Sequence, residues 1–189
     1  MNVEKKSPRE RIVETAMRLF NQSGAHAVGI DRIIAESGVA KRTFYHHFPS
    51  KAALLADYFR RKDDIWYARL VRHTADPSLP PLERLLGLFD GLGEWYAEPD
   101  FFGCAFIRGL SDFGNECGDP ELVRCIGEHF RRTGELVEAL LRPVRPRDYR
   151  EFIPRILSLI AGATVVAHAT RDPAIAEVNK RMARTLLAA

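Results

Sequence analysis

The segment from Lys41 to Phe48 carries the side chains with the clearest chemical potential. Its sequence, KRTFYHHF, places Phe44 and Phe48 four residues apart, which is about one helical turn. At about 100° per residue, the opposite side of such a helix is polar; it carries Arg42, Thr43 and His46, with Tyr45 and His47 on its flanks. Arginine can pair with guanine, a threonine methyl can meet a thymine methyl, and histidine or tyrosine can hold phosphates. The segment therefore predicts a helix able to read a DNA groove, and an ordinary amphipathic surface helix is the alternative.

The sequence before this segment predicts two helices that would hold it in place. Ser7 can cap the first helix, with Pro8 in its first turn and Glu10 completing a capping box. Gly24 is expected to end this helix in the left-handed conformation. A second, shorter helix is expected over residues 30–37, and Gly38 ends it. Two short helices joined by a glycine-containing turn form a helix-turn-helix.

The charge of the chain is unevenly distributed. Its 189 residues carry a formal net charge of +3, but residues 1–62 contain twelve Lys and Arg against six Asp and Glu, which is +6. The remaining residues are therefore at −3. A basic first third suggests a polyanionic partner there, although a solvated basic face would have the same composition.

The run from Ile33 to Lys51, IIAESGVAKRTFYHHFPSK, resembles the DNA-binding signature of TetR-type regulators. The resemblance covers about residues 8–60, and the turn glycine, the Thr-aromatic-Tyr run, the His-Phe pair and the Ser-Lys pair all agree. It implies an all-α, non-enzymatic protein of about nine helices, with a three-helix DNA-binding domain over 1–50 and a helical ligand-binding and dimerisation domain over 51–189. It also implies a transcriptional regulator, in the first instance a repressor, that binds a palindromic operator as a homodimer and is released by a small-molecule inducer.

The resemblance also assigns roles within the DNA-binding segment. It implies that four side chains approach base edges or nearby phosphates: Lys41, Arg42, Thr43 and His46. It implies that Tyr45, His47 and Lys51 hold the DNA backbone. Ser50 is better placed as the N-cap of the next helix, which would direct that helix's first amides and Lys51 toward a phosphate.

Three residues depart from the usual pattern of the family. Gly29 stands where a Ser or Thr commonly caps the second helix, so its phosphate contact would fall to a backbone amide or be lost. Ile34 replaces a small alanine at the crossing of the two helices, which could change their angle. Ala40 replaces a common serine before the recognition helix and removes one capping hydroxyl. These departures leave the motif intact and bear on affinity and register.

Beyond residue 50, apolar stripes and proline-containing breaks predict the remaining helices. They are expected over about 50–71, from 82 into the 90s, from about 101, and over 121–141, 148–170 and 173–187. The penultimate helix contains many small residues that permit close approach of a neighbour. The resemblance implies that the last two helices pair with their copies in a four-helix dimer interface, and a monomeric helix pair is the alternative.

An aromatic-rich stretch in this second region could line an effector pocket. Its candidate lining residues are Phe89, Trp95, Phe102, Cys104 and Phe106. An apolar pocket with a few polar groups suits a hydrophobic or aromatic molecule, although an aromatic cluster is more often plain core.

The three cysteines, Cys104, Cys117 and Cys125, form no CxxC pair and predict reduced thiols rather than a disulfide framework. Cys125 and His129 are four residues apart and could share a metal with Cys104 or Cys117; we nevertheless expect no metal or other cofactor. A thiol- or metal-responsive regulator of the same fold is one alternative function. A helical enzyme or ligand carrier is a more remote one, because no catalytic motif stands out.

The N-terminal sequence lacks the apolar core of a secretion signal, and no segment is expected to be apolar enough to span a membrane. We therefore expect a cytoplasmic protein with no membrane partner.

Overall fold

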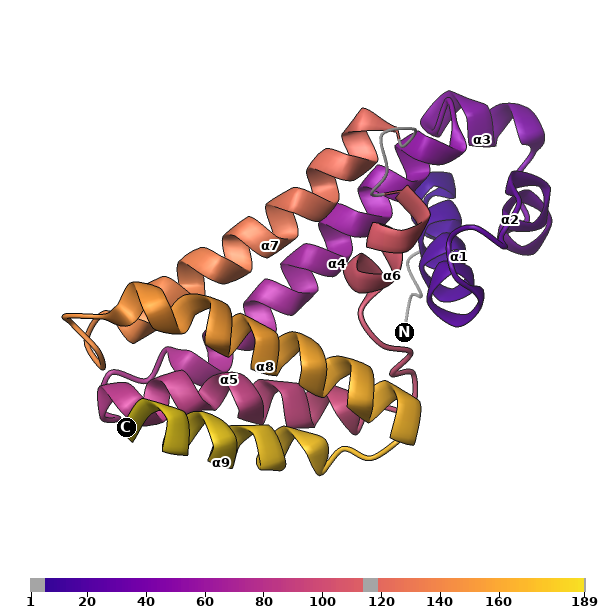
Figure 1. Ribbon diagram of the computed structural model, residues 1–189. Coiled ribbons are helices and arrows are strands. Elements are labelled where there is room, and N and C mark those ends of the chain that lie inside the picture. The colour runs from indigo at the N-terminus through magenta and orange to yellow at the C-terminus, as the bar shows by residue number, and fades with distance from the viewer. Residues whose placement is uncertain (1–5, 114–118, 189) are drawn as a thin grey trace. The chain divides into compact units, whose positions relative to one another are not determined.

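The computed structural model describes residues 6–113 and 119–188, and within these residues every regular element is a helix (Figure 1). The helices are α1 (Pro8–Ser23), α2 (Ile30–Ser37), α3 (Lys41–His47), α4 (Lys51–Thr74), α5 (Pro81–Tyr96), α6 (Ala105–Phe113), α7 (Pro120–Leu141), α8 (Tyr149–Thr170) and α9 (Ile175–Ala188). The predicted all-α fold is confirmed. The principal differences in helix bounds are that α4 continues to Thr74 and that α6 begins at Ala105 rather than near residue 101.

Helix α1 begins as its sequence predicts. The Glu10 amide donates to Ser7 Oγ at 3.3 Å, and the Ser7 amide donates to Glu10 Oε2 at 2.7 Å, which completes the capping box. Hydrogen bonding of the Glu10 carboxylate to the side chain and the backbone amide of Ser7 holds the pKa of Glu10 below its usual value. At the other end, Gly24 has φ 80° and ψ 151°, so its backbone is extended at positive φ rather than left-handed helical as predicted.

The turn between α2 and α3 depends on Gly38. This residue has φ 62° and ψ 31°, the left-handed conformation that glycine adopts without steric cost, and its amide donates to the carbonyls of Ile34 and Ala35. Helix α3 starts three residues later and ends at His47, with Phe48 as its C-cap in an extended conformation. The helix-turn-helix predicted from the sequence is confirmed.

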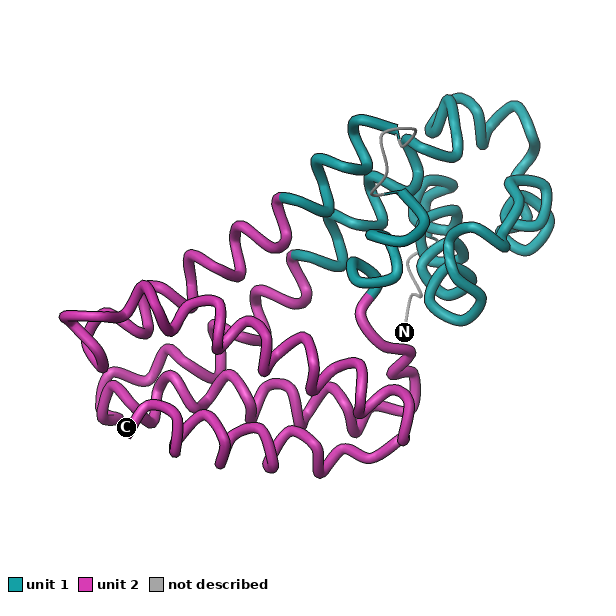
Figure 2. Tube along the Cα trace, in the orientation of Figure 1, with its two compact units in different colours: residues 1–63, 105–127 teal, residues 64–104, 128–189 magenta. Residues whose placement is uncertain are grey.

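The chain divides into two compact units (Figure 2). Unit 1 contains residues 1–63 and 105–127, and unit 2 contains residues 64–104 and 128–189. Helices α4 and α7 therefore contribute residues to both units, and α6 belongs to unit 1. This structural division differs from the expected functional boundary after residue 50, which stays a prediction.

The core of unit 1 is built from the apolar stripes of α1 to α4. Its side chains interlock around the fully buried ring of Phe20, which packs edge-on against Tyr58 at 5.3 Å between ring centroids. The same core includes Ile12, Val13, Ala16, Leu19, Val28, Ile33, Phe44, Phe48, Leu54 and Phe59. Burial of these side chains supplies most of the driving force that fixes the two short helices α2 and α3, since isolated helices of eight and seven residues are marginal in water.

Unit 2 has its own core, in which α5, α8 and α9 all pack against one another. Two ion pairs fasten α9 to α5 at the edge of this core. Lys180 Nζ lies 2.6 and 2.8 Å from the two carboxylate oxygens of Asp90, and Arg184 pairs with both oxygens of Glu83 at 2.7 and 2.8 Å. Buried Tyr96 also donates to or accepts from Thr164 Oγ1 of α8 at 2.8 Å.

Helices α4 and α5 approach closely where α5 carries glycine. An added Cβ at Gly87 would lie 2.1 Å from the carbonyl oxygen of His73, and one at Gly91 would lie 3.2 Å from the His73 ring. Two glycines one turn apart therefore form the flat surface against which the end of α4 rests.

Helix α8 departs from one expectation. By length and composition alone it is apolar enough to cross a membrane, with a mean hydropathy of 1.6, whereas no such segment was expected. Its buried side packs in the core of unit 2, through Phe152, Ile156, Ile160, Ala163, Thr164 and Ala167. A helix with one side in a core passes the same test, so this finding is weak evidence for a membrane span.

Candidate nucleic-acid interface

Helix α3 is anchored by its phenylalanines. Phe44 is fully buried and Phe48 nearly so, and their ring centroids lie 6.2 Å apart. The guanidinium of Arg9 on α1 lies 5.2 Å from the centroid of the Phe48 ring and also pairs with Asp57 of α4 at 2.6 Å. Arg9 of α1 therefore contacts the C-cap of α3 and is itself held by α4.

The opposite side of α3 is open to solvent, as its periodicity predicted. Lys41, Arg42, Tyr45 and His46 are exposed, and Thr43 and His47 are half-buried at the edges. The rings of His46 and His47 lie 5.1 Å apart, and Lys41 Nζ reaches Asp31 Oδ1 only at 3.6 Å. Six of the seven predicted DNA-binding residues thus share one small helix, while their contact with DNA stays a prediction.

The seventh residue, Lys51, sits at the start of α4. Ser50 Oγ accepts the amide of Ala53 at 3.1 Å, so its predicted role as N-cap is confirmed. Lys51 Nζ donates to the backbone carbonyl of His26 at 3.3 Å. Partial burial lowers the pKa of Lys51, and the nearby carboxylate of Asp112 acts in the opposite direction. This lysine is therefore tied to the loop between α1 and α2, and its predicted phosphate contact would have to form from that position.

Two of the three departures from the family pattern, Gly29 and Ala40, have visible local effects. Gly29 and Ala40 are the N-caps of α2 and α3, and neither helix has a side-chain cap. The first amides of both helices are therefore left without a side-chain acceptor, which is the arrangement that suits an anion. Ile34 is half-buried on α2.

Arg11 is a positioning residue that sequence reasoning missed. Its guanidinium donates to the Ser37 carbonyl from Nε at 3.0 Å and from Nη2 at 2.6 Å, and Nη2 also donates to the Gly38 carbonyl at 2.5 Å. These carbonyls end α2 and begin the turn, where backbone acceptors have no helical partner. An arginine on the polar side of α1 gives no signal in the sequence that would identify this contact.

The predicted effector-lining residues are divided between the two units. In unit 2, Phe89 is buried in the core, while Trp95, Phe102 and Cys104 are half-buried. Phe106 lies in unit 1, where its ring packs 5.3 Å from that of Phe59. The five residues therefore do not form one cluster within either unit, and their role in ligand binding stays a prediction.

Trp95 has aromatic neighbours that the sequence did not indicate. Its ring lies 5.2 Å from Trp66 of α4 and 4.9 Å from Phe101, and Trp66 Nε1 donates to Thr133 Oγ1 of α7 at 3.2 Å. Half-buried tryptophans of this kind offer flat apolar surface to a small molecule.

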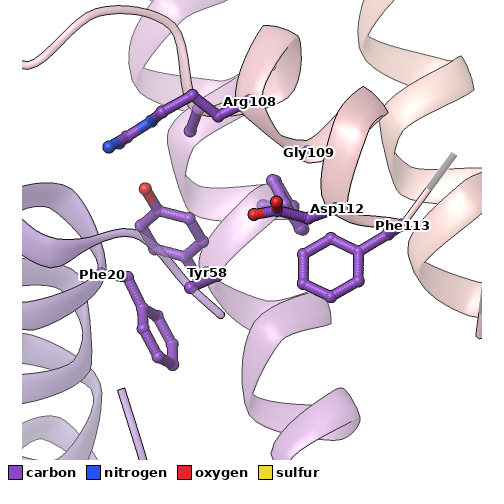
Figure 3. Close-up of a pocket in the computed structure, with 9 residues that line it drawn as sticks. Phe20, Tyr58, Arg108, Gly109, Asp112 and Phe113 are labelled. Atoms are coloured by element: carbon purple, nitrogen blue, oxygen red, sulfur yellow. The ribbon is translucent and has the colours of Figure 1, made fainter. Parts of the chain in front are cut away.

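Unit 1 contains a small hollow between α1, α4 and α6 (Figure 3). Figure 3 shows the rings of Phe20, Tyr58 and Phe113 around it, with Arg108 and Asp112 of α6 at its polar side. Arg108 Nη2 donates to the Asn21 carbonyl of α1 at 3.3 Å. The volume of about 10 Å³ holds roughly one water molecule, so the hollow does not accommodate an organic effector as it stands.

The thiols do not assemble into an evident metal site. Cys125 and His129 are both buried on α7, and burial is the main cause of a raised pKa for the Cys125 thiol. Within residues 6–113 and 119–188, no three His, Cys, Asp or Glu side chains are grouped as metal ligands. Cys117 lies outside the described residues, so its predicted part in such a site is untested.

A buried three-helix core that presents the polar side of α3 defines a helix-turn-helix DNA-binding protein. Residues 12–58 match the family model described as bacterial regulatory proteins, tetR family. The chain is 36% identical over 77 residues to the uncharacterised regulator YxaF of Bacillus subtilis, and 35% identical over 83 residues to the repressor KstR2 of Mycobacterium tuberculosis. These alignments cover 41% and 44% of this chain, and the chain spans about two fifths of the length of each relative.

A likeness also extends along nearly the whole chain. The crystal structure of SCO4454, a TetR-family regulator from Streptomyces coelicolor, superposes with a TM-score of 0.86 at 27% identity, over 95% of this chain and 94% of that one. Residues 12–58 therefore form a DNA-binding domain of the tetR type, and nearly the whole chain shares the fold of this TetR-family regulator.

Proposed function

We propose that this protein is a cytoplasmic repressor that binds a palindromic operator as a homodimer and leaves it when a small molecule binds. The observation that carries the proposal is the exposed polar side of α3, opposite the buried rings of Phe44 and Phe48. In this proposal Arg42, Thr43, Lys41 and His46 approach bases or adjacent phosphates, and Tyr45, His47 and Lys51 hold the backbone. The name of the relative KstR2 supports repression over activation.

The outer surface of α8 and α9 supports the homodimer. Val165, Val166, Val178 and Met182 are large apolar side chains that are exposed there. A groove of about 660 Å³ between the two helices is bordered by Arg155, Leu159, Val178, Arg181, Met182, Thr185 and Leu186. A two-fold axis through this surface would bury the apolar side chains of both copies and leave the arginines at the rim.

Such a dimer would present two copies of α3 to one side of a duplex. If their spacing is about 34–36 Å, they enter successive major grooves, and the operator contains inverted half-sites. An effector dissociates the complex only if it binds the DNA-incompetent state more tightly than the DNA-competent one. The half-buried aromatic side chains of unit 2 support a hydrophobic effector.

The test is to sequence the genomic fragments that the purified full-length protein retains and to footprint the enriched site. We expect one enriched inverted repeat with half-site centres about 10 base pairs apart. Arg42→Ala is the variant to compare, because it changes only the exposed side of α3. Phe44→Tyr is unsuitable because it alters the core. Retention of fragments without any common sequence at low salt would contradict the proposal.

A further inference from the structure

Arg69 of α4 has a buried nitrogen with no acceptor. Its side chain is 12% exposed, and Nη2 donates to Glu98 Oε1 at 2.5 Å. Nη1 is fully buried and has no hydrogen-bond partner among the described residues. A buried guanidinium N–H normally finds an acceptor, because leaving it unsatisfied costs folding free energy. The orphaned donor therefore marks a position where an acceptor oxygen is missing.

Two tryptophans lie close in sequence to Arg69 and to its partner Glu98. Trp66 precedes Arg69 by three residues on α4, and Trp95 of α5 precedes Glu98, just beyond the end of α5, by three residues. The two indole rings lie 5.2 Å apart at 59°, and both are half-buried. Because the Trp66 N–H is already bonded to Thr133, the Trp66 ring adds apolar contact rather than a competing donor.

The local charges select the kind of acceptor. Glu98 already pairs with Arg69, and Glu94, one turn earlier on α5, also interacts with this guanidinium while it binds Arg72 and His73. The two carboxylates already balance the charges of Arg69 and Arg72, so a further carboxylate would leave an uncompensated anion there. A neutral oxygen, such as a ketone carbonyl, would satisfy Nη1 without that repulsion.

We propose that Arg69 Nη1 is the polar anchor of the effector site, and that the effector is a flat apolar molecule carrying a neutral acceptor oxygen and lying against Trp66 and Trp95. The inference rests on the proposed effector control and names the chemical class of the effector. The indole rings provide the apolar contact, and the guanidinium selects the acceptor.

The test uses three molecules of the same shape: 2-acetylnaphthalene, its hydrocarbon counterpart 2-ethylnaphthalene, and 2-naphthoate. Binding to the full-length protein without DNA is followed by the indole N–H signals in a proton–nitrogen correlation spectrum, because Trp66 and Trp95 are the only tryptophans in the chain. We expect the ketone to bind about tenfold or more tightly than the hydrocarbon and more tightly than the carboxylate. No binding of the ketone, or equal binding of ketone and hydrocarbon, would overturn the inference, and so would tighter binding of the carboxylate.

Two variants of α4 identify the anchor. Arg69→Met retains the apolar stem and removes the donors, and it should bring ketone and hydrocarbon within about twofold of each other. Arg72→Met is the matched control, because Arg72 also pairs with α5 but is mostly exposed, and it should keep the wild-type preference. A preserved ketone preference in Arg69→Met contradicts the assignment. If this variant does not fold, Arg69→Lys keeps the charge while losing the guanidinium Nη1, and it should lose most of the same preference.

The two proposals fail separately. Ketone selectivity that depends on Arg69, with no operator release by any of the three molecules, would leave the anchor in place and count against effector control. Operator release by a molecule that binds equally well to Arg69→Met would support effector control and count against Arg69 as the anchor.

Discussion

Arg11 Nη2 donates a hydrogen bond of 2.5 Å to the carbonyl oxygen of Gly38, 27 residues later in the sequence. The same guanidinium binds the Ser37 carbonyl through Nε and Nη2. One side chain of α1 thus holds the end of α2 and the turn that leads to α3. We expect the orientation of α3 to depend on this contact, which is made from outside the two helices of the motif.

Replacing Arg11 tests this dependence. We expect Arg11→Met to lower the free energy of unfolding by about 1–2 kcal/mol, because two backbone carbonyls lose a charged donor. Operator affinity measured well below the unfolding temperature should fall as well, since the turn before α3 is less constrained. Arg18→Met is the control: Arg18 makes an exposed ion pair with Glu36, and its loss should cost at most about 1 kcal/mol. Equal effects of the two variants in urea unfolding would contradict the role given to Arg11.

Arg42 and Lys51 should affect DNA binding in different ways. Arg42→Ala should cost about 1–3 kcal/mol at one base position and relax the sequence preference there. Lys51→Ala should weaken binding to all sequences alike. It should also reduce the slope of log affinity against log salt concentration by about 1, which corresponds to the loss of one phosphate contact. Binding to a set of single-base operator variants at several salt concentrations separates the two. An unchanged sequence preference in Arg42→Ala would show that this residue does not read a base.

The exposed surface of α8 and α9 gives a test of the homodimer. Met182 is 53% exposed beside the groove, and Met182→Asp would bury an unpaired carboxylate in each copy across a two-fold axis. We expect sedimentation to show a monomer and operator affinity to fall sharply. Val123→Asp changes a 40% exposed apolar side chain of α7 and should leave the oligomeric state unaltered. A dimer that persists in Met182→Asp would place the interface elsewhere.

Two glycine substitutions should change stability in opposite directions. Gly87→Ala would place a methyl group 2.1 Å from the His73 carbonyl oxygen, so α5 must move away from α4, at a cost of about 2–3 kcal/mol or more. An added Cβ at Gly127 in α7 meets nothing within 4 Å, and Gly127→Ala should stabilise by about 0.5–1 kcal/mol through the better helix propensity of alanine. Thermal unfolding of both variants under one condition measures the difference. A tolerated Gly87→Ala would rule out the close approach of α4 and α5.

Removing the thiols distinguishes a small-molecule sensor from a thiol- or metal-responsive one. In a variant with Cys104→Ser, Cys117→Ser and Cys125→Ala, we expect operator release by the effector to be unchanged. Alanine is used at the third position because Cys125 is buried and a hydroxyl there would need a partner. Zinc or copper added to the wild-type protein should alter neither helicity nor operator affinity. Loss of the response in the variant would favour thiol sensing.

The sequence by itself determined α1, α2 and α3 and the polar side of α3. Capping residues, the glycine of the turn and the four-residue spacing of Phe44 and Phe48 are local features, and each acts through the backbone or the next helical turn. Local patterns of this kind can be recognised without knowledge of distant residues. The helix-turn-helix was therefore predictable at the level of individual residues.

The tertiary structure decided which distant side chains meet. Three kinds of contact join residues that are between 26 and 101 positions apart in the sequence. They are the Arg11 contact with the α2–α3 turn, the ion pairs that fasten α9 to α5, and the pairing of Trp66 with Trp95. It also placed Phe106 in unit 1 and the other four predicted effector residues in unit 2. An apolar stripe shows that a helix face will be buried but not what covers it, because the partner depends on how all the helices pack together.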